Sequence, residues 1–146
     1  KRYTSGSLIL AMENAGQLIE DEDLRAQIKG SGIGTSATRA EIIKKLTNIK
    51  YIALNKKTQV ITPTQLGEMI FGVVHGSIKS LLNPELTASW ELGLTQVAEG
   101  KITADEYMDK LDSFIKGRFK NVINLNNAGQ MVSYYNYVAQ FYRRKK

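Results

Sequence analysis

The sequence predicts a mainly α-helical chain with one small β-hairpin and a winged-helix core. Residues 30–62 follow the order of the recognition half of a winged helix: a glycine turn, a short amphipathic helix, a tight loop and two β-prone segments. With 146 residues, 42% of them hydrophobic, the chain is long enough to bury a core as one domain. Its 23% charged residues and two prolines argue against wholesale disorder.

Two helices are predicted before the glycine turn. The first spans residues 4–19, with Thr4 or Ser5 as its cap. Its apolar residues fall on one face: Leu8, Met12, Ala15 and Ile19. The acids at residues 20–23 suit the first turn of a second helix, which extends through Ile28.

A glycine-rich turn leads into the central helix. Three glycines let the backbone turn sharply there: Gly30, Gly32 and Gly34. Thr35 or Ser36 caps the helix, which extends to about Asn48. The predicted inward-facing residues are Ala40, Ile43, Leu46 and Thr47. The cations are predicted on the other faces: Arg39, Lys44 and Lys45.

A hairpin with a basic tip follows the central helix. The β-prone segments 51–54 and 59–62 are joined through residues 55–58. Because this connection contains Lys56 and Lys57, it has the form expected of a wing.

A further helix is predicted from about Gln65 to Val74, with Pro63 or Thr64 near its start. Residues 75–77 are expected to break or bend the chain after it. His75 is the only histidine, and no carboxylate or second histidine lies at ligand spacing from it. We therefore interpret His75 as structural or exposed.

Two longer helices are predicted next. The first begins at Pro84, ends at Gly100 and carries an apolar stripe: Leu86, Trp90, Leu94 and Val97. Thr103 and Glu106 form a capping-box signature for the second, which extends to about Phe119. Its predicted buried residues are Met108, Leu111, Ile115 and Phe119.

The last predicted helix spans residues 130–142 and precedes four cations at the end of the chain. Its apolar and aromatic residues recur at three- and four-residue spacing: Met131, Tyr134, Tyr135, Val138, Phe141 and Tyr142. Aromatic side chains interleaved with cations can stack on and steer single-stranded nucleic acid. The same spacing also suits packing, either within this domain or against other parts of a longer protein. Packing is the more common reason for such spacing.

Charge is arranged in alternating blocks. Residues 1–30 carry four positive and five negative charges, and residues 31–62 carry six and one. Residues 63–112 carry three and eight, and residues 113–146 carry seven and none. A polyanion is the usual partner of such a field, although a solvated lysine-rich face has a similar composition.

Composition excludes several classes of protein. The chain has no cysteine, which excludes disulfides and thiolate metal sites. The apolar runs are too short to cross a membrane and no signal peptide is recognisable, so we expect a cytoplasmic protein with no membrane partner. Because the chain begins with Lys1 and its first methionine is Met12, we expect it to be part of something longer.

The start of the central helix is a candidate phosphate site. Thr35, Ser36 and Thr38 supply small hydroxyls, and Arg39 supplies a guanidinium. The first amides of a helix lack intrahelical acceptors and favour anions. The sequence therefore predicts contact with nucleic acid at this point.

Short motifs occur in order along residues 2–118. They are Arg2-Tyr3-Thr4, Gly6-Ser7-Leu8, Met12-Glu13, GIGTSATRAEII at residues 32–43, Tyr51-Ile52, TPTQLG at residues 62–67, PELTASWE at residues 84–91 and VAEG at residues 97–100. Together they resemble the C-terminal core segment of type IA DNA topoisomerases. The form with Thr35, Thr38 and Arg39 is that of the topoisomerase III variety. Family members commonly carry a basic residue followed by glycine before Tyr51, where this chain has Ile49 and Lys50.

This resemblance implies a fold and a function. Type IA topoisomerases relax and decatenate DNA by transient single-strand cleavage at a tyrosine, assisted by magnesium on a separate acidic domain. The similar segment lies in the domain that grips single-stranded DNA. Residues 1–120 would form this core segment, with a winged-helix-like unit at about residues 20–80, and residues 121–146 a basic, aromatic extension. The expected DNA-binding residues are Thr35, Ser36, Thr38, Arg39, Lys44 and Lys50.

The catalytic parts of such an enzyme are not recognisable in this sequence. None of the seven tyrosines has the family's nucleophile context, and no acidic motif of the family's metal-binding kind occurs. We therefore expect a DNA-binding fragment that is inactive alone, with no catalytic residue, metal or cofactor of its own. Magnesium and the remaining domains are expected in a bacterial, nucleoid-associated parent.

Two other functions remain open at this stage. A free-standing winged-helix transcriptional regulator would prefer a duplex site and read base edges. A purely structural interaction domain would show no salt-dependent binding of nucleic acid. The topoisomerase interpretation predicts sequence-tolerant binding of single strands that falls steeply with salt.

Overall fold

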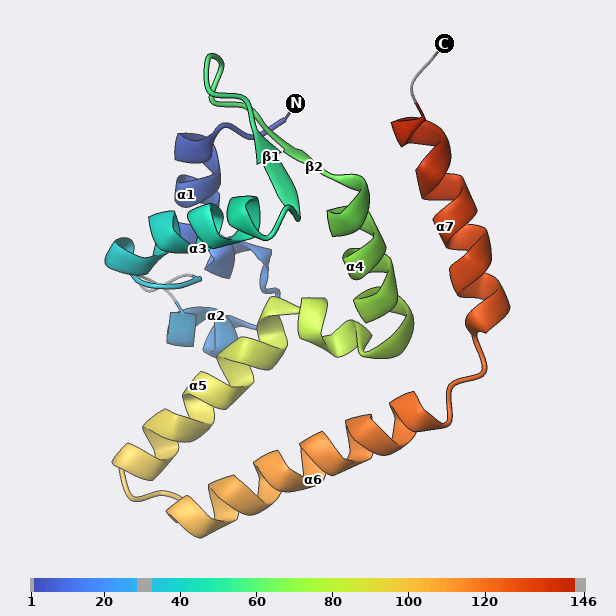
Figure 1. Ribbon diagram of the computed structural model, residues 1–146. Coiled ribbons are helices and arrows are strands. Elements are labelled where there is room, and N and C mark those ends of the chain that lie inside the picture. Colours follow the sequence, from blue (N-terminus) through green and yellow to red (C-terminus); the bar gives the residue numbers. More distant parts are fainter. Residues whose placement is uncertain (1, 29–32, 144–146) are drawn as a thin grey trace.

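The computed structural model describes residues 2–28 and 33–143, and Figure 1 shows their arrangement. The α-helices are α1 (Ser5–Glu13), α2 (Glu22–Ile28), α3 (Ser36–Asn48), α4 (Gln65–Ser77), α5 (Pro84–Ala98), α6 (Ala104–Ile123) and α7 (Ala128–Tyr142). Two 3-10 turns, η1 (Ala15–Leu18) and η2 (Lys79–Leu82), and two strands, β1 (Ile52–Leu54) and β2 (Ile61–Pro63), complete the described elements. The predicted mainly α-helical class with one hairpin is confirmed. The glycines predicted to turn at positions 30 and 32, and the cations at positions 144–146, lie outside the described residues.

The hairpin is held on its outer edge by the chain that precedes α1. β1 and β2 pair antiparallel, with Ala53 opposite Thr62. On the other side of β2, Thr4 forms a bridge with Val60, and the amide of Ile61 donates to the carbonyl of Tyr3 at 2.8 Å. Thr4 also caps α1 by accepting from the amide of Ser7. One residue therefore both starts α1 and fixes it to the hairpin.

Two small hydrophobic cores join elements that are distant in the sequence. In the first, Met12 of α1, Ile43 of α3 and Ile61 of β2 meet, so the first helix, the central helix and the hairpin form one unit. In the second, Ile19 and Ala88 are buried together and Leu24 packs against them, which joins α2 to α5. Figure 1 shows α1, α3 and the hairpin gathered at one side of the molecule, with α2 beside α5 below them and α6 extending away from the end of α5.

Helix α7 packs along α4, and a glycine allows the contact. A Cβ atom on Gly72 would lie 2.0 Å from the ring of Tyr134, so the ring rests directly on the backbone of α4. The Tyr134 hydroxyl donates to the carbonyl of Glu68 at 3.0 Å, and the Tyr142 hydroxyl lies 2.9 Å from the Glu68 carboxylate. Burial, with the Glu68 carboxylate beside it, raises the pKa of Tyr142. Packing is thus one role of the aromatic helix.

Two sequence-based helix ends were wrong. The first helix ends at Glu13 and gives way to η1, and the amide side chain of Asn14 bonds back to the carbonyl of Leu10 at this end. The chain does not break after Val74: α4 continues through Ser77. Gly76 lies under Met131, and its carbonyl accepts from the side chain of Asn127, so packing against α7 offsets the low helix propensity of glycine.

The predicted buried face of α6 was also wrong. Met108, Ile115 and Phe119 are exposed, as is Leu94 on α5. Trp90 instead makes edge contacts with Tyr107 at 5.7 Å and Phe114 at 5.6 Å between ring centroids. Tyr107 and Phe114 each directly precede a residue predicted to be buried, Met108 and Ile115. Their rings contact α5 because edge-to-face pairs with the indole are favourable.

The close packing of α7 on α4 predicts a stability difference between two glycines. Gly72→Ala should lower the free energy of unfolding by about 1–3 kcal/mol, the usual cost of overpacking. Gly117→Ala, in α6 with nothing within 4 Å of the added carbon, should be neutral or stabilising by up to about 1 kcal/mol. Urea unfolding followed by circular dichroism measures both. Equal stability of the two variants would contradict the tyrosine-on-glycine contact.

Candidate nucleic-acid interface

The start of α3 is fixed by a reciprocal cap. Thr35 is the N-cap: its hydroxyl accepts from the amide of Thr38 at 3.3 Å, and the Thr38 hydroxyl accepts from the amide of Thr35 at 2.8 Å. Both threonines are exposed, as is Ser36 between them. The amides of Ser36 and Ala37 belong to the first turn, for which an α-helix has no intrahelical acceptor. Two hydroxyls are thus engaged in the cap itself, at a surface open to solvent.

Arg39 is buried, contrary to its predicted place on an outer face. Its side chain is 5% exposed. Its Nε donates to the carbonyl of Ile33 at 3.2 Å, and one terminal nitrogen lies 3.9 Å from the Glu13 carboxylate. The long side chain folds back over the turn before α3 because these acceptors satisfy its charge there. Ala40, predicted inward, is exposed instead.

The middle of α3 presents a shallow basic depression. Lys44 and Lys45 are exposed, and with Thr38 they line a hollow of about 400 Å³ along the helix. The ammonium of Lys44 lies 3.4 Å from the carboxylate of Glu41, in a pair open to solvent that is worth little. The two lysines are therefore accessible to an anion.

Lys50 follows the end of α3, at a position where the backbone is in the left-handed conformation. The Tyr51 amide donates to the carbonyl of Leu46, and the Lys50 amide to that of Thr47, which is the Schellman pattern of helix ends. Lys50 has a φ of 61°. Helix α5 ends in the same pattern with Gly100, at a φ of 71°. The family resemblance places a glycine at position 50, and the backbone here explains why.

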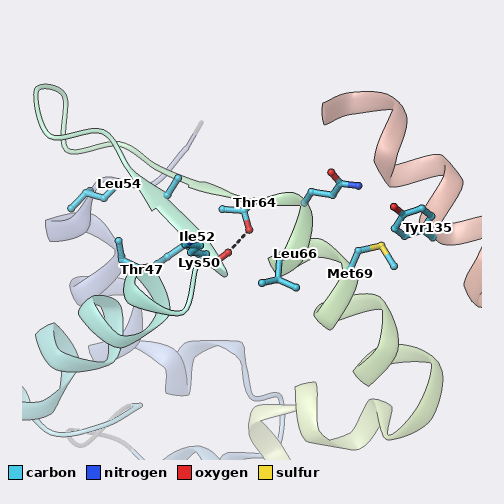
Figure 2. Close-up of a pocket in the computed structure, with 10 residues that line it drawn as sticks. Thr47, Lys50, Ile52, Leu54, Thr64, Leu66, Met69 and Tyr135 are labelled. Atoms are coloured by element: carbon cyan, nitrogen blue, oxygen red, sulfur yellow. Dashed lines mark hydrogen bonds between the residues drawn. The ribbon is translucent and has the colours of Figure 1, made fainter. Parts of the chain in front are cut away.

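Beyond Lys50 the surface is hollowed. A groove of about 800 Å³ lies between the end of α3, the hairpin, the start of α4 and the side of α7. Its apolar wall includes Ile52, Leu66 and Met69, and Tyr135 closes the far side (Figure 2). The Thr64 hydroxyl donates to the carbonyl of Lys50, drawn as a dashed line in Figure 2, and so joins the α3 end to the α4 start.

Five of the six predicted DNA-binding residues are exposed along α3 and its two ends: Thr35, Ser36, Thr38, Lys44 and Lys50. Over its 13 residues the helix is about 20 Å long. Arg39 does not belong to this exposed line. Sequence reasoning missed Thr64 as part of the surface and left Tyr135 open between stacking on nucleic acid and packing. Thr64 lies in the TPTQLG motif. Tyr135 directly follows Tyr134, which packs inward.

The described residues carry no sign of other site chemistry. Among them no group of three or more histidine, aspartate or glutamate side chains is placed to hold a metal ion. His75 is exposed, with its ring 5.9 Å from that of Phe71. No helix in residues 2–28 and 33–143 is long and apolar enough to span a membrane.

Comparison with known proteins identifies the family. The family model described as DNA topoisomerase matches residues 1–109. DNA topoisomerase 3 of Bacillus licheniformis is 31% identical over 128 residues, which cover 86% of this chain and 17% of the relative. DNA topoisomerase 3 of Staphylococcus epidermidis is 35% identical over 131 residues, with 88% and 17% covered. DNA topoisomerase 1 of Alkalihalophilus pseudofirmus is 43% identical over 97 residues, with 66% and 13% covered.

This chain therefore spans about a sixth of the length of the curated relatives that it matches. The family model covers 109 of its 146 residues and ends within α6. On these matches, the chain belongs to the type IA DNA topoisomerase family.

Proposed function

We propose that this chain holds single-stranded DNA within a type IA topoisomerase that relaxes and decatenates DNA by transient single-strand cleavage. The observation that carries the proposal is the exposed line of hydroxyls and ammonium groups on α3, from Thr35 to Lys50. Hydroxyls at a helix start and lysines farther along bind phosphates without reading bases. Such contacts give affinity that is tolerant of sequence.

The helix and hairpin form a winged-helix-like unit in this proposal. Ile43 holds α3 in the core, so that Lys44 and Lys45 on the next positions face outward. The hairpin tip carries Lys56 and Lys57, whose charges extend the basic surface beyond the helix. Family membership favours this role in a topoisomerase over that of a free-standing regulator.

The groove beyond Lys50 gives the strand a place for its bases. Its wall is largely apolar, and Tyr135, a residue that is 48% exposed, lies beside it. Single-strand binding surfaces combine cations for the backbone with aromatic rings on which bases stack. Lys50 and Tyr135 supply one of each, from elements that are tied together through Thr64 and α4.

The role of Arg39 in the proposal is positioning. A guanidinium bonded to the Ile33 carbonyl and facing Glu13 has little surface left for a phosphate. It keeps the turn and the start of α3 in place, and the neighbouring threonines contact the strand. Removing it should affect folding as well as binding.

The rest of the reaction belongs to other parts of the enzyme. We propose that the nucleophilic tyrosine and the magnesium-binding domain lie outside this chain, in a bacterial, cytoplasmic and nucleoid-associated parent. Within the chain we divide the core segment, residues 1–120, from the basic, aromatic extension, residues 121–146. The extension packs on α4 through Tyr134 and Tyr142, which brings Tyr135 to the groove.

Replacing Lys50 with glycine separates the contribution of its charge to DNA binding from the cost of its left-handed backbone to stability. Lys50→Gly should weaken binding of a labelled single-stranded oligonucleotide about three- to tenfold, because one phosphate contact is lost. The same variant should be more stable than the parent by about 0.5–1 kcal/mol, because glycine adopts the left-handed conformation freely. Fluorescence anisotropy and urea unfolding measure the two effects, with duplex of the same sequence as competitor.

Lys110→Ala is the matched control, since it removes an equal charge from the exposed side of α6. It should leave single-strand affinity nearly unchanged. If Lys50→Gly binds as tightly as the parent, or if duplex competes as well as single strands, the proposed surface or substrate is wrong.

The stacking role of Tyr135 is tested by an aromatic series. Tyr135→Ala should weaken single-strand binding about ten- to a hundredfold, as expected for one lost stacking contact, and Tyr135→Phe should restore it. Tyr137→Ala removes an exposed ring from the same helix, which contacts Phe141 and does not line the groove. Equal losses in Tyr135→Ala and Tyr137→Ala would count against a base in the groove.

A further inference from the structure

Helix α4 lines a second hollow on the side away from the groove. Phe71 and His75 lie one turn apart on α4, and Lys79 follows at the same spacing in η2, which Figure 1 shows between α4 and α5. With Asn83 they line a space of about 510 Å³, the α4 hollow. Phe71 lies two residues beyond Met69, so these two side chains leave nearly opposite sides of the helix. The α4 hollow and the groove share no lining residue.

Two aromatic rings meet in one wall of the α4 hollow. The centroids of the Phe71 and His75 rings lie 5.9 Å apart, with an angle of 30° between the ring planes. Phe71 is 54% exposed, and His75 is exposed as well. Bases stack on exposed aromatic rings whatever their identity, because every base has a π-face. This wall therefore suits a nucleobase.

Polar groups beside the rings suit a phosphate. Lys79 is exposed and takes part in none of the ion pairs of the described residues. The Ser80 hydroxyl oxygen is buried and has no hydrogen-bond partner in residues 2–28 and 33–143, so a ligand oxygen could supply the missing acceptor. Lysine and serine side chains are both common partners of nucleic-acid phosphates. The carboxylate of Glu85 accepts from the side chain of Asn83 at 3.0 Å and does not line the hollow.

A neighbouring hollow connects this site with the start of α3. It has a volume of about 670 Å³, shares residues 82–84 with the α4 hollow and extends to Thr35. Its wall is mainly apolar and includes one acid, Glu91. A strand whose phosphates cross α3 from Lys50 to Thr35 would leave the helix here, with its bases toward the apolar wall. The α4 hollow lies next along this path.

We propose that the α4 hollow is a second nucleotide site for the DNA strand that α3 holds. A base stacks on the rings of Phe71 and His75, and the adjoining phosphate binds Lys79 and the Ser80 hydroxyl. This assignment depends on the proposed function, because the strand reaches the hollow from Thr35. Rings and an ammonium group bind without reading base edges, so the site tolerates any sequence. A free nucleotide offers the same base and phosphate and is the alternative occupant.

Phe71→Ala tests the aromatic wall. The variant should bind a labelled single strand of about 16 nucleotides about tenfold or more weakly than the parent chain, because one stacking contact is lost. Phe119→Ala removes an exposed phenylalanine from α6 and is the matched control, which should bind as the parent does. Fluorescence anisotropy measures all three proteins. Equal affinity of the parent and Phe71→Ala would overturn the second site alone, whereas a parent that binds no single strand would overturn the proposed function and this site with it.

Phe71→Trp reports on what occupies the hollow, because a stacked base quenches indole fluorescence. Trp90, the single tryptophan of the parent chain, packs against Tyr107 and Phe114 and sets the background. The bound strand should remove most of the added emission of Phe71→Trp and leave that of the control Phe119→Trp. Deoxyadenosine monophosphate at the same nucleotide concentration should quench far less, since the strand raises the local concentration of its own bases.

Two results of the fluorescence experiment would overturn the proposal. Emission of Phe71→Trp that stays unquenched while anisotropy shows the strand bound would mean that no base enters the α4 hollow. Equal quenching by the mononucleotide and the strand would assign the hollow to a free nucleotide.

Discussion

The buried guanidinium of Arg39 is the contact on which the candidate DNA surface depends. A charge removed from water is tolerated only where acceptors meet it, and here the Ile33 carbonyl and the Glu13 carboxylate do so. These acceptors lie on the turn before α3 and at the end of α1. The arginine therefore joins three segments at one point, and the direction in which α3 leaves the turn follows from it.

The other end of α3 is held by a different device. The Schellman pattern puts Lys50 in a left-handed conformation, and the Thr64 hydroxyl fixes its carbonyl to the start of α4. Gly67 lets α4 approach closely, since a Cβ there would lie 1.9 Å from the carbonyl of Tyr51. With both ends anchored, the lysines between them keep a constant spacing. A phosphate-binding surface on a fixed helix does not have to be ordered when the strand arrives.

Local signals in the sequence predicted local structure well. The caps at Thr35, Thr64 and Thr103 are formed as expected, because a cap depends only on residues within one turn. Gly100 ends α5 for the same reason. Outcomes that depended on distant partners were missed. Arg39 is buried because Glu13, which is distant in the sequence, lies beside it. Helix α4 continues past Gly76 because α7 packs against it. The apolar face of α6 is exposed because Trp90 contacts Tyr107 and Phe114 instead. Helical spacing shows which residues share a face, but it does not say which of two neighbouring faces meets a partner.

The central claim is that exposed groups on α3 hold the phosphates of a single strand. Its most direct test is the salt dependence of single-strand affinity, compared between the parent chain and Lys44→Ala. Each phosphate contact contributes about 0.7 to the slope of log affinity against log salt concentration. The account predicts that Lys44→Ala reduces the steepness of this slope by about that amount and leaves the fold intact. An unchanged slope in a folded variant would contradict it.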